Sequence, residues 1–224
     1  MTPRFHDRHD AGRQLAAQLS HLSRRPDLIV LGLPRGGVVV AAEVAAALHA
    51  PLDALVVRKL GVPGHEELAM GAIASGGIRV LDELIVRELR ISPAAIEAVE
   101  ASERAELERR ESLYRGNRPM PELNRKIAII VDDGLATGST MRAAIGAVRL
   151  QQPEWIVCAV PVASRGVLVM VEALVDEVVC LEIPEPFLAV GLRYTDFSPT
   201  SDQEVVHLLR AEHSGNAADS MSRA

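Results

Sequence analysis

Two adjacent carboxylates followed by a loop of small and hydroxyl residues form the stretch of this sequence best suited to chemistry. Asp132 and Asp133 follow the apolar run 127–131 and precede residues 134–140, which read GLATGST. The uncharged run, rich in β-branched residues, predicts a central strand that is covered on both faces. The next residues, MRAAIGAVRL, have helical spacing, so the N–H groups of the loop and of the helix start should face outward together. This arrangement predicts an anion site suited to a phosphate group.

Acidic side chains directly before a phosphate site require a ligand that carries more than a phosphate. A ribose 5-phosphate fits, because its phosphate can bind the loop while its 2- and 3-hydroxyls donate hydrogen bonds to Asp132 and Asp133. The loop residues that would bind the phosphate are Ala136, Thr137, Gly138, Ser139 and Thr140. The alternative is a buried strand followed by an ordinary acidic turn.

The segment 129–140 resembles the phosphoribosyl diphosphate (PRPP) signature of the type I phosphoribosyltransferases, with apolar residues, two acids, two further residues and then ATGST. The resemblance implies an α/β fold with an open, mostly parallel sheet flanked by helices and a small hood. It also implies transfer of the ribose 5-phosphate of PRPP to a nitrogen nucleophile, a nucleobase or related base, with release of pyrophosphate and with Mg²⁺ as cofactor. Asp132 and Asp133 would hold the ribose and, through water, the Mg²⁺ ion. Asp133 lies where relatives place an acid that could accept a proton from the acceptor.

The acceptor and the catalytic status are less constrained. No segment matches the hoods of the hypoxanthine, adenine, orotate or uracil enzymes, and the likeness is greatest to an uncharacterised bacterial subgroup. A non-catalytic PRPP- or nucleotide-binding regulator is the alternative function, because one fold can serve both roles. The net charge of -6 and the short segment before the first strand argue against a nucleic-acid-binding region. We therefore favour an enzyme.

A second loop with anion-binding features lies near the N-terminus. Residues 27–48 predict a short strand, a PRGG turn and an Ala-rich helix. Gly36 and Gly37 leave the backbone free to expose N–H groups at the helix start, and Arg35 adds a positive charge. In the family, the loop after the first strand binds pyrophosphate, often through a non-proline cis peptide bond, and the resemblance places that bond between Arg35 and Gly36. The alternative is a plain turn with a solvated arginine.

A pair of basic residues is expected at the end of the next strand. Residues 53–57 predict a second parallel strand, which would place Arg58 and Lys59 at its carboxyl end, where ligands bind in open α/β sheets. The pair resembles the RK pair of adenine-type relatives, and a catalytic role for Lys59 follows from that resemblance; the alternative is a solvated strand end. Residues 61–67 predict a loop that corresponds to the closing loop of the family, in which His65 and Glu66 are more simply read as exposed.

Aromatic residues are concentrated near the C-terminus. Phe187, Tyr194 and Phe197 lie in a Pro-containing loop, about 183–200, of an aromatic-poor chain. They predict either a stacking wall for a flat acceptor or a minor core beneath a long loop. Near the N-terminus, FHDRHDAGR also resembles the opening of the bacterial subgroup, although we interpret Arg8 and Asp10 as a surface ion pair and assign them no chemistry.

The other elements follow from periodicity and turn residues. Helices are predicted at 10–22, capped by Asp10, at 82–89, 93–115, 166–174 and 201–210, and strands at 68–74, 78–81, 155–162 and 177–181. The alternating charges of 93–115 could form dimer contacts, but a solvated face is the simpler reading.

Composition limits the class of protein. The 224 residues predict one domain over 1–211 and a disordered tail at 212–224. The loop at about 183–200 would form the hood, to which N-terminal residues could also contribute. Cys158 and Cys180 lie among apolar residues, which suggests reduced core cysteines in a cytoplasmic protein. No segment is apolar enough to cross a membrane. We expect a homodimer that binds PRPP and a small-molecule acceptor, and no nucleic acid.

Overall fold

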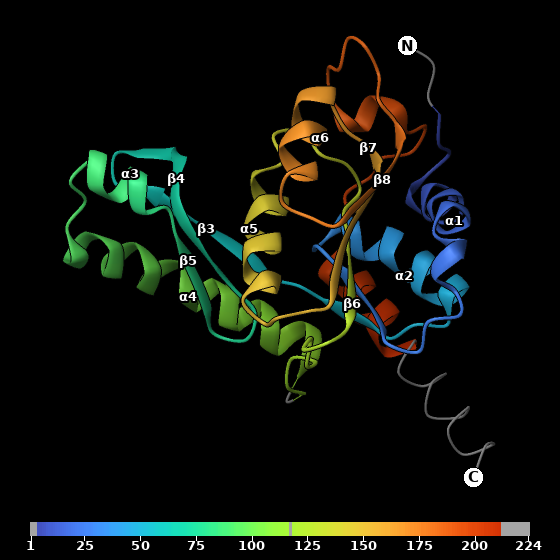
Figure 1. Cartoon of the computed structure of the whole chain (residues 1–224), viewed down its shortest axis with the longest axis horizontal. Coiled ribbons are helices and arrows are strands. Elements are labelled where there is room, and N and C mark those ends of the chain that lie inside the picture. Colours follow the sequence, from blue (N-terminus) through green and yellow to red (C-terminus); the bar gives the residue numbers. More distant parts are fainter. Residues whose placement is uncertain (1–3, 117, 212–224) are drawn as a thin grey trace.

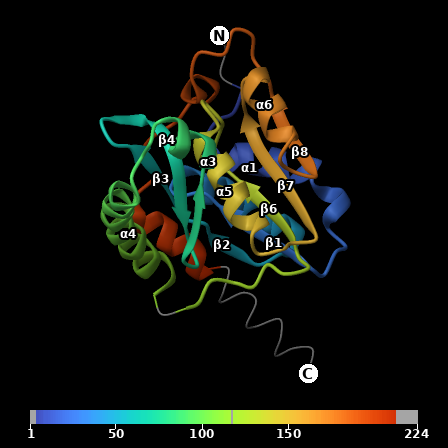
Figure 2. The same cartoon turned by 60° about the vertical axis from the view of Figure 1, so that its left-hand side comes forward.

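A parallel five-stranded sheet forms the centre of the protein. In the computed structural model, which describes residues 4–116 and 118–211 (Figure 1), the strands pair in the order β2-β1-β6-β7-β8, and every pair is parallel (Figure 2). The strands are β1 (Leu28–Gly32), β2 (Leu52–Ala54), β6 (Ile127–Val131), β7 (Trp155–Val162) and β8 (Glu177–Glu182). The predicted open parallel sheet is confirmed.

Helices cover both faces of this sheet. On one side, α1 (Arg8–Gln18) and α2 (Gly36–Leu48) pack in one core cluster with Ile129 and Val131 of β6. On the other side, α5 (Ser139–Arg149) and α6 (Arg165–Glu172) pack with Ala128 and Ile130. Successive side chains of a strand point to opposite faces, so an uninterrupted apolar strand is what a sheet covered on both sides requires.

A second sheet extends from this body as an arm, residues 57–115. Strands β3 (Val57–Val62), β4 (His65–Ala74) and β5 (Ile78–Leu81) form an antiparallel sheet with α3 (Glu83–Glu88) and α4 (Pro93–Arg115) beside it (Figures 1 and 2). The arm shares the main core, because Leu60, Met70 and Leu107 belong to the same cluster as the buried face of α2.

Two predictions for this region are wrong. The predicted parallel strand 53–57 is only β2, and Arg58 and Lys59 lie inside the antiparallel strand β3 instead of at a parallel strand end. The predicted loop 61–67 is a hairpin in which β3 and β4 are separated by Pro63 and Gly64 alone, with Gly64 at φ 78°. A Pro-Gly turn joins antiparallel neighbours over a very short distance.

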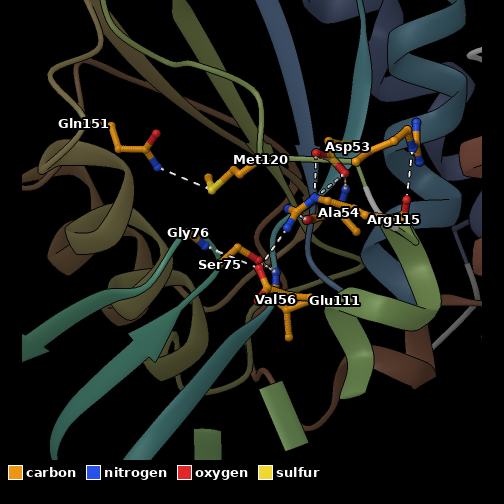
Figure 3. Close-up of polar contacts among 10 residues, drawn as sticks. Asp53, Ala54, Val56, Ser75, Gly76, Glu111, Arg115, Met120 and Gln151 are labelled. Atoms are coloured by element: carbon orange, nitrogen blue, oxygen red, sulfur yellow. Dashed lines mark hydrogen bonds and ion pairs between the residues drawn. The ribbon is translucent and has the colours of Figure 1, made fainter. Parts of the chain in front are cut away.

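A buried ion pair joins the arm to the body (Figure 3). Arg115, near the end of α4, donates from Nε to both carboxylate oxygens of Asp53 in β2, at 3.1 and 2.8 Å. Its other nitrogens bind Glu111 and the backbone carbonyl of Ala54. Because Asp53 Oδ1 also accepts the Ala54 N–H at 2.7 Å, the cluster is closed by its own hydrogen bonds.

The N-terminal residues 4–7 and the loop 183–200 meet, and together they form the hood. Phe5 forms a β-bridge with Tyr194, and backbone hydrogen bonds connect residues 4–6 to residues 193–196. The loop contains the short helix η2 (Val190–Arg193). Residues 4–7 therefore lie beside the loop 183–200 in the structure.

The remaining boundaries differ in detail from the predictions. Helix α1 begins earlier than predicted and is capped by Asp7, whose side chain accepts the Asp10 N–H, and a short helix η1 (Ser20–Leu22) follows it. Helices α3 and α4, strands β7 and β8 and a helix at 202–211 lie close to their predicted ranges. Both cysteines are free. The predicted tail 212–224 lies outside the described residues.

Candidate active site

The two predicted anion-binding loops lie side by side at the carboxyl edge of the parallel sheet. Strands β1 and β6 end in register, with Gly32 opposite Val131, so the loops that follow them leave the sheet together. The contact is close: a Cβ atom built on Gly37 would lie 2.8 Å from the Val131 carbonyl oxygen, and one on Gly36 would lie 2.0 Å from Asp133 Oδ2. Glycine is needed at both positions because the backbone of one loop rests on the acids of the other.

The PRGG loop contains the predicted kind of peptide bond at a different position. The cis bond joins Pro34 and Arg35, whereas the prediction placed it between Arg35 and Gly36. The prediction was therefore displaced by one residue. Arg35 is the N-cap residue of α2 and is exposed, and its side chain makes no capping hydrogen bond. Its guanidinium is accessible to an anion at the start of this helix.

The two acids each have one carboxylate oxygen engaged by the protein. Asp132 Oδ1 accepts the N–H of Asp133 at 2.9 Å, and Asp133 Oδ2 accepts the Nε–H of Arg8 at 2.7 Å. Burial raises the pKa of Asp132 well above its usual range, and the neighbouring charge of Asp133 raises it further. Burial also raises the pKa of Asp133, although the hydrogen bond and the charge of Arg8 oppose that shift. The other oxygen of each acid is left for a ligand that can donate a hydrogen bond.

The loop after the acids has the geometry of an anion site. Gly138 is the N-cap residue of α5 at φ 71° and has no side chain to cap the helix, and Thr137 Oγ1 makes only a long contact of 3.4 Å with the Ser139 N–H. The first N–H groups of an uncapped helix carry partial positive charge and are open to a ligand. The hydroxyls of Thr137 and Ser139 lie 3.1 Å apart, while Ala136 and Thr140 are exposed. The five predicted phosphate-binding residues therefore lie together around one helix start.

The two predicted basic residues have different surroundings. Arg58 binds Glu103 of α4 at 2.6 Å, so its charge is directed to the arm. Lys59 lines a groove of about 320 Å³ with Thr140 and another of about 620 Å³ with Ser139. Arg58 also lines the smaller groove with Thr140, but of the two basic residues only Lys59 lines the larger groove beside Ser139.

The hairpin residues His65 and Glu66 were predicted to be exposed, and only Glu66 lines a groove near the phosphate loop. His65 and Glu66 are both exposed, in agreement with the simpler interpretation of these residues. Glu66 also lines the smaller groove beside Lys59 and Thr140. The structure therefore brings the tip of the hairpin to the same region as the phosphate loop.

The aromatic residues form a small core in the hood, as the second of the two interpretations proposed. Phe5 and Tyr194 are buried, and Phe187 and Phe197 pack against them. The hydroxyl of Tyr194 donates to the backbone oxygen of Asp133 at 2.7 Å. Tyr194 therefore binds the backbone of the acidic loop, and its buried ring has no face exposed for stacking against an acceptor. Acceptor binding by Phe187 and Phe197 stays a prediction.

Arg8 is the residue that sequence reasoning missed. We expected a surface pair with Asp10, but the Arg8 side chain is only 11% exposed and binds Asp133. Asp10 instead accepts hydrogen bonds from the His6 N–H and from Gln14. The partner of Arg8 is 125 residues away in the chain, so no local pattern could reveal the contact. The likeness of FHDRHDAGR to the bacterial subgroup was the one signal available.

Ligands of open α/β proteins bind beyond the carboxyl ends of the strands, and the two acids and the start of α5 lie at that edge of this sheet. A family model described as "Phosphoribosyl transferase domain" matches residues 4–195. The chain belongs to this family, and its sheet and flanking helices have the fold of the type I phosphoribosyltransferases.

Individual relatives agree with this assignment. Proteins of two strains of Mycobacterium tuberculosis, both named "Putative phosphoribosyl transferase", are 50% identical over 209 residues, which is 93% of this chain and 47% of theirs. The chain therefore spans about half the length of these curated relatives. The crystal structure of TT1426 from Thermus thermophilus is 42% identical, with a TM-score of 0.84 over 92% of this chain and 97% of that one.

Within residues 4–116 and 118–211, no helix has the length and apolar character that a membrane crossing requires. The cytoplasmic location and the homodimer stay predictions.

Proposed function

We propose that the protein transfers the ribose 5-phosphate of PRPP to a nitrogen nucleophile, a nucleobase or related base, and releases pyrophosphate. One observation carries the proposal: two adjacent acids, each with one uncommitted oxygen, lie directly before an uncapped helix start. The 2- and 3-hydroxyls of a ribose would donate to Asp132 and Asp133. The 5-phosphate would accept hydrogen bonds from the N–H groups of residues 136–140.

The leaving pyrophosphate would bind on the opposite side of the sugar from the acceptor. The backbone N–H groups of Gly36 and Gly37 lie at the start of α2, next to the exposed side chain of Arg35. Lys59 would add a second charge from β3. These groups would act through position and preorganised charge, by stabilising the pyrophosphate as negative charge develops on it.

The donor set fits a Mg²⁺ ion that shares its ligands with the substrate. Mg²⁺ prefers oxygen ligands and is usually bound by one or two carboxylates together with phosphate oxygens and water. Asp132 and Asp133 supply oxygens of this kind, whereas the described part of the chain contains no group of three or more His, Cys, Asp or Glu side chains able to hold a metal alone. When bound, the ion would neutralise charge on the diphosphate. The two acids would hold it, directly or through water.

The test is pyrophosphate release. The protein is incubated with PRPP and Mg²⁺, and a panel of purine and pyrimidine bases and other nitrogen nucleophiles is added one at a time. We expect at least one acceptor to produce stoichiometric pyrophosphate and the matching ribonucleotide. If PRPP binds but no acceptor releases pyrophosphate, the non-catalytic binding role is correct instead.

A further inference from the structure

We infer that Arg8 is a positioning residue for the sugar-binding acids, a role that rests on the proposed function. Arg8 holds one oxygen of Asp133 and thereby directs the other toward the ribose, and it attaches that acid to the hood. Three observations support this role: the burial of the ion pair, the contacts of Arg8 with the hood, and the lack of space around the carboxylate.

The ion pair is close and largely withdrawn from water. The Arg8 and Asp133 side chains are 11% and 18% exposed, and Nε lies 2.7 Å from Oδ2. Within the described residues, this is the only salt bridge that either acid forms. A charged hydrogen bond in such a setting is short and directional, so it fixes the orientation of the carboxylate plane.

The rest of the guanidinium binds the hood. Arg8 Nη1 donates to the backbone oxygen of Ser198 at 2.8 Å, and the guanidinium carbon lies 3.9 Å from the centre of the Phe197 ring. Phe197 packs against Tyr194 with ring centres 4.9 Å apart, and Tyr194 returns to the backbone of Asp133. The hood is therefore linked to this acid twice, through Arg8 to its carboxylate and through Tyr194 directly to its main chain.

The carboxylate has little space for another orientation. Gly36 lies so close that a Cβ atom there would be 2.0 Å from Asp133 Oδ2 and 2.6 Å from Arg8 Nε. The pair is thus enclosed by the start of α1, the PRGG loop and the hood. A site held from several sides in this way is preorganised for its ligand. Loss of Arg8 should therefore affect recognition of the sugar and spare recognition of the phosphate.

The experiment compares Arg8→Gln and Arg8→Lys with Arg4→Gln. Arg4 is a matched control because it also pairs with an acid across the hood, Glu182 at 3.2 Å, but is 53% exposed and touches neither acid of the site. Calorimetric titrations with ribose 5-phosphate and with inorganic phosphate give the preference for the sugar as a ratio of affinities. Thermal unfolding of each variant is recorded in parallel.

We expect Arg8→Gln to reduce the preference for ribose 5-phosphate about tenfold, as loss of a charged hydrogen bond implies, with phosphate affinity unchanged. Arg8→Lys should recover part of the preference because it keeps the charge, and Arg4→Gln should keep all of it. The inference is overturned if Arg8→Gln retains the preference, or if both affinities fall together. A wild-type protein that binds ribose 5-phosphate no more tightly than phosphate would instead contradict the proposed function itself.

Discussion

Two Asp–Arg pairs join distant parts of this chain, and they differ in what they leave unbound. Asp53 and Arg115 are almost fully buried, and both carboxylate oxygens are bound by the protein (Figure 3). Asp133 and Arg8 are also mostly buried, but one oxygen of Asp133 is uncommitted. The first pair is complete without a ligand, whereas the second is complete only when a donor reaches the remaining oxygen. A structural ion pair and a ligand-binding one are thus distinguished by their unused hydrogen-bonding capacity.

The largest effect is expected from breaking the Asp53–Arg115 pair, which is closed because the protein binds both carboxylate oxygens. Asp53→Ala leaves Arg115 buried without its partner, and the free energy of unfolding should fall by about 3–5 kcal/mol, the usual cost of an unpaired buried charge. Urea denaturation measures the change. A loss below about 1 kcal/mol would show that the cluster does not hold the arm to the body.

The Arg8–Asp133 pair, which is open because one oxygen of Asp133 is uncommitted, should be sensitive to a single methyl group added beside it. Gly36→Ala would place a Cβ atom against Asp133 Oδ2, and PRPP affinity should fall about tenfold, equivalent to about 1.4 kcal/mol. Gly166→Ala is the matched control, because a Cβ atom there has no neighbour within 4 Å. Equal PRPP affinities of the two variants by calorimetry would contradict the close fit of the PRGG loop against the acids.

Replacing one open-site acid should stabilise the protein. The folded-state pKa of Asp132 is raised, so the folded protein retains a proton that the unfolded chain has released, and stability falls as pH rises from the unfolded pKa to the folded one. Asp132→Asn removes this cost and should raise the free energy of unfolding at pH 7. The gain should vanish below about pH 4 in denaturation measurements, near the unfolded pKa of an Asp. A destabilised variant at pH 7 would contradict the assigned burial.

The smallest effect is expected at an exposed pair that belongs to neither class. Arg58 binds Glu103 in a partly exposed setting, so Arg58→Gln should cost less than about 1 kcal/mol and leave PRPP affinity within about threefold. Lys59→Gln should weaken PRPP binding more. The reverse order would restore Arg58 to the binding site.

The part of the site that the sequence predicted is local in the chain. A strand, two acids, a small-residue loop and a helix occupy 23 consecutive residues, 127–149, and their own side chains determine their geometry. The failures depend on partners elsewhere. The residues 57–62 favour a strand whether it pairs in parallel or antiparallel fashion. Their antiparallel pairing follows from the Pro63–Gly64 turn and from β4. Arg8 could not be placed because its partner lies 125 residues away.

The central claim is that Asp132 and Asp133 bind the sugar of PRPP, and calorimetric titration of the Asp132→Asn, Asp133→Asn double variant tests it most directly. We predict that PRPP affinity in the presence of Mg²⁺ falls by at least about a hundredfold, because the carboxyl groups that would bind the sugar hydroxyls and the ion are lost, while the variant unfolds at no lower temperature than the wild type. Unchanged PRPP affinity in the folded variant would contradict the account.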